Sequence, residues 1–255
     1  MVRKPEEFTL GSPVTEPGRF ANEMAHLKRI GRSFVIATKE VTVEQFLRFR
    51  EHRWEKRYSP FKDSPVVSVS WYEAAAYCNW LSELEGIPSD QWCYKPNAEG
   101  KYDEMMSMKP NHLKLAGYRL PTNAEWEYAC RSGSVVSRYF GRSHELLHRY
   151  AWYQINGDDQ AWQVGKLRPN ELGLFDTLGN AVECVEDPML LNMSNKRDDV
   201  ENKEYLLIDE RAPRFVRGGS FVFGPVVLRC AYRSNLRPSF RYFSTGFRPA
   251  KTCPD

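Results

Sequence analysis

The chain has few histidines, and its cysteines are not spaced for metal binding. Five histidines and six cysteines occur in 255 residues, and no two cysteines are separated by only two residues. Zinc ribbons and thioredoxin-like redox centres depend on such closely spaced pairs. We therefore expect no zinc site and no disulfide-exchange chemistry, and we expect the cysteines to be buried thiols.

Long apolar runs and a strong net charge are also missing. No stretch reaches the roughly 20 apolar residues of a membrane-spanning helix, and no apolar secretion signal follows Met1 to Glu7. The formal net charge is +3, with lysine and arginine scattered among 33 acidic residues. The sequence therefore predicts no membrane span and no basic surface for nucleic acid. We expect a cytoplasmic protein, with a virion or surface display as open alternatives.

The composition that is present is that of a globular protein. Hydrophobic residues make up 42% and charged residues 27% of the chain, which are values typical of folded domains. No internal repeat or linker marks a domain boundary. We expect residues 1–255 to form one domain with polar surface insertions near residues 91–112 and 189–213.

Helix and strand signals lie in different parts of the chain. Capping boxes, in which a Ser or Thr is followed three residues later by Glu or Gln, predict three helices. These pairs are Thr42 with Gln45, Ser70 with Glu73, and Thr122 with Glu125. Strands are predicted at residues 33–38, 215–221, 226–233 and 246–250. Early helices and mostly late strands favour an α+β fold over alternating βαβ units.

Several short motifs follow one another along the chain. They are Ile36 to Thr42, Pro65 to Trp71, Tyr118 to Thr122, Glu125 to Glu127, Asn170 to Gly173, Gly179-Asn180, Arg217 to Ser220, and Thr245 to Arg248. In their order these motifs resemble the formylglycine-generating enzyme (sulfatase-modifying factor) family, and the resemblance extends from about Phe8 to Ala250. It implies a C-type-lectin-like α+β fold of the formylglycine-generating-enzyme type, with much irregular structure and with calcium sites.

The residues that give this family its oxidase activity are missing. The family's oxidases bind copper(I) through two cysteines between Gly-Gly-Ser and Arg-Cys-Ala motifs, because soft thiolates are the ligands this ion prefers. Here residues 221–229 contain no cysteine, histidine or acidic residue. We therefore expect no copper and no catalysis, with a divergent family enzyme as the alternative. The resemblance also implies that Cys230 faces Cys130, and it leaves open whether the two are bonded.

The segment Phe175 to Glu183 resembles a calcium-binding turn of the family. Carried over by position, the implied ligands are the side chains of Asp176 and Glu183 and the backbone carbonyls of Gly179 and Ala181. Oxygen ligands suit calcium, which is a hard cation. We predict a structural calcium ion here. The alternative is a turn in which Asp176 caps backbone amides without an ion.

Residues 218–250 have a restricted composition. They contain no Lys, Glu, Gln, Met or Trp, although these five types make up about a fifth of the chain. In this respect they resemble the variable proteins of diversity-generating retroelements, a subgroup with the same fold. In that subgroup, errors at adenines convert Asn codons into codons for other residues but not for those five types.

The candidate diversified positions form a predicted ligand-binding surface. Phe and Tyr offer large stiff contact areas, and Ser, Asn and Gly offer adaptable hydrogen bonds. We therefore interpret the chain as a non-catalytic protein that binds a protein or another macromolecular ligand, with a degenerate structural subunit as a third alternative. Five arginines, Arg229, Arg233, Arg237, Arg241 and Arg248, are interpreted as contacts of the scaffold. The candidate positions are Val222, Phe223, Gly224, Val226, Val227, Tyr232, Ser234, Asn235, Leu236, Ser239, Phe240, Tyr242, Phe243 and Ser244.

Overall fold

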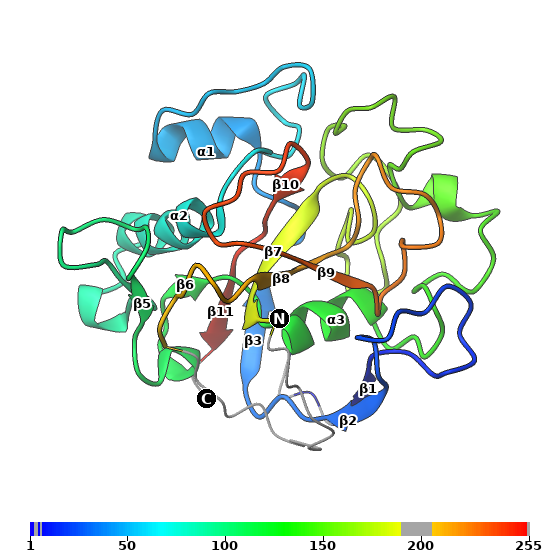
Figure 1. Ribbon diagram of the computed structural model, residues 1–255, viewed down its shortest axis with the longest axis horizontal. Helices are drawn as coiled ribbons and strands as arrows, with labels where there is room; N and C mark the ends of the chain where they lie inside the picture. Colours follow the sequence, from blue (N-terminus) through cyan, green and yellow to red (C-terminus); the bar gives the residue numbers. More distant parts are fainter. Residues whose placement is uncertain (3–4, 6, 190–205, 254–255) are drawn as a thin grey trace.

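The computed structural model describes residues 1–2, 5, 7–189 and 206–253, and it has short helices and strands joined by long irregular segments (Figure 1). The predicted α+β class is therefore confirmed. Among these residues no helix combines the length and the apolarity needed to cross a membrane. The helices are α1 (Val43–Phe49), α2 (Trp71–Leu84) and α3 (Asn123–Arg131), with 3-10 turns η1 (Ser89–Gln91), η2 (His112–Lys114) and η3 (Leu147–Arg149).

The strands form small sheets. The largest has the order β10-β7-β8-β9, a second has the order β3-β11-β6, and β1-β2 and β4-β5 are hairpin-like pairs. The bounds are β1 (Phe8–Leu10), β2 (His26–Lys28), β3 (Ser33–Ile36), β4 (Tyr94–Lys95), β5 (Ser107–Met108), β6 (Tyr118–Arg119), β7 (Val182–Pro188), β8 (Arg214–Arg217), β9 (Arg233–Leu236), β10 (Thr245–Gly246) and β11 (Ala250–Cys253).

All three predicted capping boxes are present. In each, the Ser or Thr side chain accepts a hydrogen bond from the backbone N–H three residues later, and the Gln or Glu side chain at that position accepts one in return. Helix α2 ends at Leu84, two residues before the predicted stop at Gly86 and with Glu85 as its C-cap. These signals are local, so the sequence was sufficient to locate them.

The strand predictions were less accurate. The predicted strand at residues 226–233 is wrong, because this segment forms turns. The Leu228 N–H donates to the Pro225 carbonyl, and the Arg229 N–H donates to the Val227 carbonyl. Strand β9 begins only at Arg233. Strand β8 ends at Arg217, because Gly218 and Gly219 adopt φ values of 87° and 73°, outside the extended region. The strand predicted at residues 246–250 is interrupted, and its two ends belong to β10 and β11.

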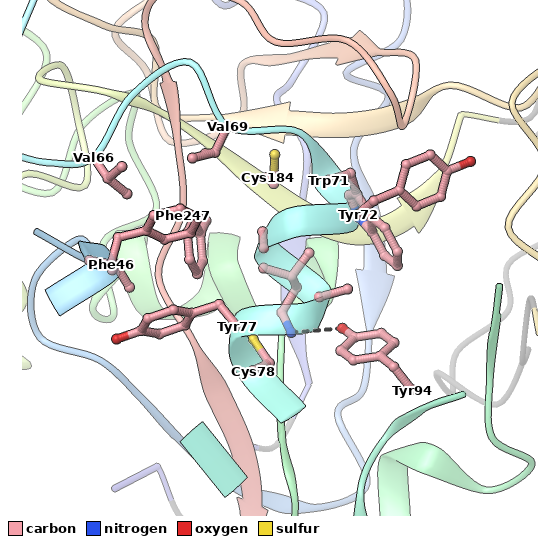
Figure 2. Close-up of a cluster of buried hydrophobic side chains, with 14 of the residues drawn as sticks. Phe46, Val66, Val69, Trp71, Tyr72, Tyr77, Cys78, Tyr94, Cys184 and Phe247 are labelled. Atoms are coloured by element: carbon pink, nitrogen blue, oxygen red, sulfur yellow. Dashed lines mark hydrogen bonds between the residues drawn. The ribbon is translucent and has the colours of Figure 1, made fainter. Parts of the chain in front are cut away.

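The main core packs around α2, and it holds the C-terminal segment in place (Figure 2). The ring of Tyr77 stacks on Phe46 at a centroid distance of 5.8 Å and contacts Phe247 edge-on at 5.3 Å. Phe247 lies between β10, which pairs in parallel with β7, and β11, which pairs with β3 and β6. The end of the chain is therefore fixed on both sides of this ring.

Segment 91–112 contributes to this core as well as to the surface. Cys93, Tyr94, Met106 and Met108 are buried in the same cluster as α2. The prediction that the whole segment runs over the surface is wrong for these residues, because the β4-β5 pair brings them inward. The connecting residues 97–105 are mostly exposed. Of the second predicted insertion, residues 190–205 lie outside the described part of the chain.

A buried glutamate joins α3 to the C-terminal sheet. Glu127 accepts a hydrogen bond from the Gly11 N–H at 2.7 Å, and it forms ion pairs with Arg131 at 2.8 Å and with Arg217 at 2.6 Å. Arg233, on β9, lies 3.6 Å from the same carboxylate. One carboxylate therefore organises the N-terminal segment, α3, β8 and β9 together.

This cluster predicts acid sensitivity. Burial alone would raise the pKa of Glu127, but Arg217, Arg131 and Arg233 lower it to about 2, below the ordinary value of 4.5. A carboxylate with a lowered pKa in the folded state contributes stability above its unfolded pKa and loses it as the pH falls. We expect Tm to decrease between pH 4.5 and pH 2, as measured by circular dichroism.

The variant Glu127→Gln separates this effect from general acid denaturation. Because it leaves buried guanidinium groups without their carboxylate, we expect it to lower the free energy of unfolding at pH 7 by about 3 kcal/mol. Its Tm should then depend less steeply on pH below 4.5 than that of the unaltered protein. Equal slopes in the two proteins would contradict the assignment.

Candidate ligand-binding surface

The candidate ligand-binding positions lie on three neighbouring segments of the C-terminal third. The first is the turn at residues 222–227, the second is Tyr232 with the edge strand β9, and the third is the loop at residues 239–243 before β10 (Figure 1). Val226 and Phe240 are each 51% exposed, and Ser239 is exposed. The remaining positions are half-buried, and they are Val222, Phe223, Gly224, Val227, Tyr232, Ser234, Asn235, Leu236, Tyr242 and Phe243. We call these three segments, without Pro225 and the arginines within them, the variable surface.

Ser244 does not belong to this surface. Its exposed fraction is 0%, and its carbonyl accepts a hydrogen bond from the Val182 N–H at 2.8 Å. The next residue, Thr245, is already paired with β7. Ser244 was predicted as a contact residue because serine is among the residues that an altered Asn codon can encode. The pairing of the neighbouring strand with β7 buries it.

Aromatic contacts connect the turn with the loop. Phe243 packs on Tyr58 at a centroid distance of 4.7 Å and lies 6.1 Å from Phe221, which is fully buried at the start of the turn. Tyr242 lies 4.4 Å from Phe243 and 6.4 Å from Phe240. The exposed ring of Phe240 is therefore connected through Tyr242 to Phe243, and Phe243 in turn lies next to the buried ring of Phe221.

The N-terminal segment adds a residue that the sequence did not reveal. Phe20 is 46% exposed, and its ring contacts Tyr232 edge-on at 5.6 Å. The backbone at Gly18 lies against Val226, because a Cβ placed on Gly18 would be 2.6 Å from a Val226 methyl carbon. Phe20 therefore extends the apolar area of the variable surface.

Buried arginines hold the segments that carry this surface. Arg229 binds both carboxylate oxygens of Glu23 at 2.6 and 2.7 Å, and also Glu16 at 2.8 Å. Arg233 packs its guanidinium over the ring of Phe215 beside Glu127. These contacts, with those of Arg248 described next, confirm the scaffold interpretation for the three residues. Arg241 is exposed and paired with Glu73 at 2.8 Å, whereas Arg237 is simply exposed.

The predicted calcium turn leads into β7 and is hydrogen-bonded to residues that flank the variable surface, through Phe221 N–H to the Asn180 carbonyl and Val182 N–H to the Ser244 carbonyl. Both carboxylate oxygens of Glu183 accept hydrogen bonds from Arg248, at 2.7 and 2.8 Å, and one also accepts from the Trp126 indole N–H. Arg248 thus supplies to Glu183 the positive charge that an ion would supply.

Asp176 is the part of this turn that fits a cation. Its Oδ2 accepts a hydrogen bond from the Gly165 N–H at 2.7 Å, which matches the capping alternative, while its buried Oδ1 has no hydrogen-bond partner among the described residues. In the same part of the chain, no group of three or more His, Cys, Asp or Glu side chains is arranged to hold a metal ion. A calcium ion held by Asp176 and Glu183 would therefore also need the backbone carbonyls of Gly179 and Ala181 as ligands. Calcium binding at this turn stays a prediction.

The family can be assigned from the sequence match. A family model described as the sulfatase-modifying factor enzyme 1-like domain matches residues 4–253. The chain belongs to this family. The formylglycine-generating enzyme of Bos taurus is 27% identical over 209 residues, which cover 74% of this chain and 44% of that protein. Chaperone protein LppX of Paenibacillus barcinonensis is 31% identical over 177 residues, covering 60% of this chain and 62% of that protein. The chain thus spans less than two thirds of these relatives.

Solved structures agree with the family assignment. Treponema denticola variable protein 1 matches this family member with a TM-score of 0.83 and 25% identity, covering 99% of this chain and 94% of that chain. PvdO from Pseudomonas aeruginosa matches with a TM-score of 0.74 at 23% identity, over 97% of this chain and 91% of that chain, and shows the fold alone. The predicted C-type-lectin-like fold of the formylglycine-generating-enzyme type is confirmed. A variable protein is among its structural relatives, as the sequence resemblance indicated.

The cysteines of this family member are almost all buried, and none is a position of the variable surface. Five of the six are buried, and the Sγ atoms of Cys130 and Cys230 are 3.4 Å apart with both residues 0% exposed. The two thus face one another, as the resemblance to the family implied, as a pair of free thiols.

Calcium binding to this family member can be tested by thermal unfolding. If calcium binds to the folded state only, Tm should rise by roughly 4 °C at a concentration ten times the dissociation constant. We expect Asp176→Asn to abolish that rise, because it removes the charge of the unpaired carboxylate. An unchanged Tm of the unaltered protein between excess EDTA and millimolar calcium would contradict the prediction.

Proposed function

We propose that this family member is a non-catalytic ligand-binding protein that contacts a macromolecule through the variable surface, in the manner of a diversity-generating retroelement variable protein. The observation that carries the proposal is a separation of roles within one segment. Between residues 218 and 250, the candidate positions other than Ser244 are exposed or half-buried, whereas Arg229, Arg233 and Arg248 are buried in ion pairs. Candidate variable positions thus alternate along this segment with arginines whose ion pairs stabilise the fold.

The physical chemistry of the surface supports contact with a partner. Phe240 and Val226 are half exposed, and apolar groups gathered on a surface favour association because water is released when a partner covers them. Phe and Tyr rings lose little conformational entropy on binding. The sheet and the aromatic layer beneath them keep these side chains in place before the partner arrives, which lowers the entropic cost of binding.

This proposal predicts unequal tolerance to substitution. We expect Phe240→Ser with Tyr242→Ser to change the free energy of unfolding by less than about 1 kcal/mol, because the two rings are surface groups. The control Leu228→Ala, at a buried position in the same segment, should lower it by about 3 kcal/mol. Urea unfolding measures both values. Equal losses in the two variants would show that the loop belongs to the core, and would contradict the proposal.

Gene context provides an independent check. A near-copy of the 3′ end of the gene, differing only at adenines and lying beside a reverse transcriptase gene, is the expected arrangement. Sequencing of the locus settles this point, and a locus without such a copy would reduce the proposal to a ligand-binding domain that is not diversified.

Membership of the family favours one second candidate, a divergent oxidase. Its relatives include formylglycine-generating enzymes, but the variable surface carries no thiol, and Cys130 and Cys230 are buried. We expect no oxidation of a cysteine-containing peptide in the presence of copper(I) and oxygen, followed by mass spectrometry. Conversion of the cysteine to formylglycine would contradict the non-catalytic assignment.

A further inference from the structure

A large cavity lies beside the variable surface. Its volume is about 1140 Å³, and its walls come from α2, from the 97–105 connection between β4 and β5, and from Glu210. Ser239 and Arg241 form the wall that it shares with the loop before β10. The cavity and the variable surface are therefore continuous, and a partner seated on the loop would reach the cavity mouth.

The cavity is more acidic than the rest of the molecule. Six carboxylate residues line it together with three cationic residues, although the whole chain carries a net charge of +3. The three cations are already paired, since Arg50 and Arg241 lie 3.8 and 2.8 Å from Glu73, and Lys101 lies 2.8 Å from Glu99. Four carboxylate residues have no cationic partner within the described part of the chain, namely Glu83, Asp103, Glu104 and Glu210.

Aromatic side chains form much of the remaining wall. Phe49, Tyr72, Trp80, Trp92 and Tyr102 all line the cavity. Trp80 is held by contacts with Phe49 and Tyr77, at centroid distances of 5.6 and 5.2 Å. The hydroxyl of Tyr102 accepts a hydrogen bond from the buried Asn79 side chain at 2.8 Å. These rings are therefore fixed by neighbouring contacts in the free protein.

Aromatic faces next to unpaired carboxylates select one kind of group. Ring faces attract cations, and they also pack against the alkyl stems of lysine and arginine. Carboxylates then bind the charged end, with arginine able to donate two hydrogen bonds to one carboxylate. An anionic group would be repelled by the excess of negative charge, and a purely apolar group would leave the carboxylates without partners.

We propose that this cavity binds a basic segment of the macromolecular partner, with lysine or arginine side chains entering between the aromatic walls and the carboxylates of α2, of the 97–105 connection and of Glu210. The inference rests on the proposed function, because the partner is the one that the variable surface contacts. It adds the chemical class of the partner at this position. The variable surface would provide specificity, and the cavity would provide a fixed attraction for basic segments.

Direct contacts connect the two regions. Ser239, in the loop, donates hydrogen bonds to Glu210 through its N–H and its hydroxyl group. Arg241, two residues later, pairs with Glu73 of α2. The loop is thus held at the cavity edge by the same acidic residues that line the cavity.

The test uses a defined peptide as the probe. A fluorescein-labelled nonapeptide of alternating glycine and arginine is titrated with the intact protein at 50 mM salt, and binding is followed by fluorescence anisotropy. The control peptide replaces arginine with glutamate. We expect the arginine peptide alone to bind. Equal binding of the glutamate peptide, or no binding of the arginine peptide at 1 mM protein, would overturn the inference.

Charge-matched variants separate the cavity from general attraction. The double variant Glu83→Gln with Glu104→Gln removes two exposed carboxylates from the cavity, and Glu145→Gln with Glu171→Gln removes two exposed carboxylates elsewhere. All four substitutions keep the side-chain shape, so folding should be preserved. We expect the cavity variant to weaken binding about tenfold and the control variant less than twofold. Equal effects would mean that binding is non-specific, and would overturn the inference.

A third variant distinguishes this inference from the proposed function. Phe240→Ser with Tyr242→Ser should leave the affinity for the arginine peptide within twofold, because the peptide occupies the cavity and not the loop. If this variant no longer binds the arginine peptide while the cavity variant binds it with unchanged affinity, the basic segment binds the variable surface instead. That result would overturn the cavity inference and leave the proposed function intact.

Discussion

The structure depends on three buried ion pairs, each of which joins an arginine in the last third of the chain to a buried glutamate. Glu127 holds Arg217, Glu23 holds Arg229, and Glu183 holds Arg248. Loss of one partner from a buried pair costs about 3 to 5 kcal/mol, because the other charge is left in a medium that does not solvate it. The three pairs therefore fix the path of residues 217–248, and between them buried side chains such as Phe221 and Leu228 alternate with exposed ones such as Val226 and Phe240.

This arrangement separates the parts of the structure that hold the fold from the segments proposed to carry function. The aromatic packing around α2 and the parallel pairing of β10 with β7 determine where the C-terminal loop begins and ends. The rings and strands that make these contacts lie outside residues 222–227 and 239–243, and of the turn only Phe223 packs against the edge of this core. Two thiols in such a segment would be suitable ligands for copper(I), whereas the aromatic and small residues present here suit the contact surface that we propose. Function thus follows from the residues placed on the fold.

The sequence predicted those features whose signals are local. The three capping boxes lie within four residues each, and all three were located correctly. Residues 226–233 were assigned to a strand, but turns after Gly224-Pro225 dominate there and the strand begins only at Arg233. Ser244 was misplaced for a different reason, since its burial follows from pairing with a strand about 60 residues earlier. Glu23 and Phe20 were missed because they lie about 200 residues from their partners Arg229 and Tyr232, and no periodicity marks such distant contacts.

The most direct test of the account is a selection from a library. The variable-surface positions within residues 222–227 and 239–243 would be randomised, with Pro225, Arg241 and all buried residues unchanged. The library would be displayed on phage and selected against a single folded protein. The account predicts that folded clones remain frequent, and that clones binding this protein are recovered with changes only at the randomised positions. A library in which folding is lost in most clones, or which yields no binder, would contradict the claim that a fixed frame carries a changeable contact surface.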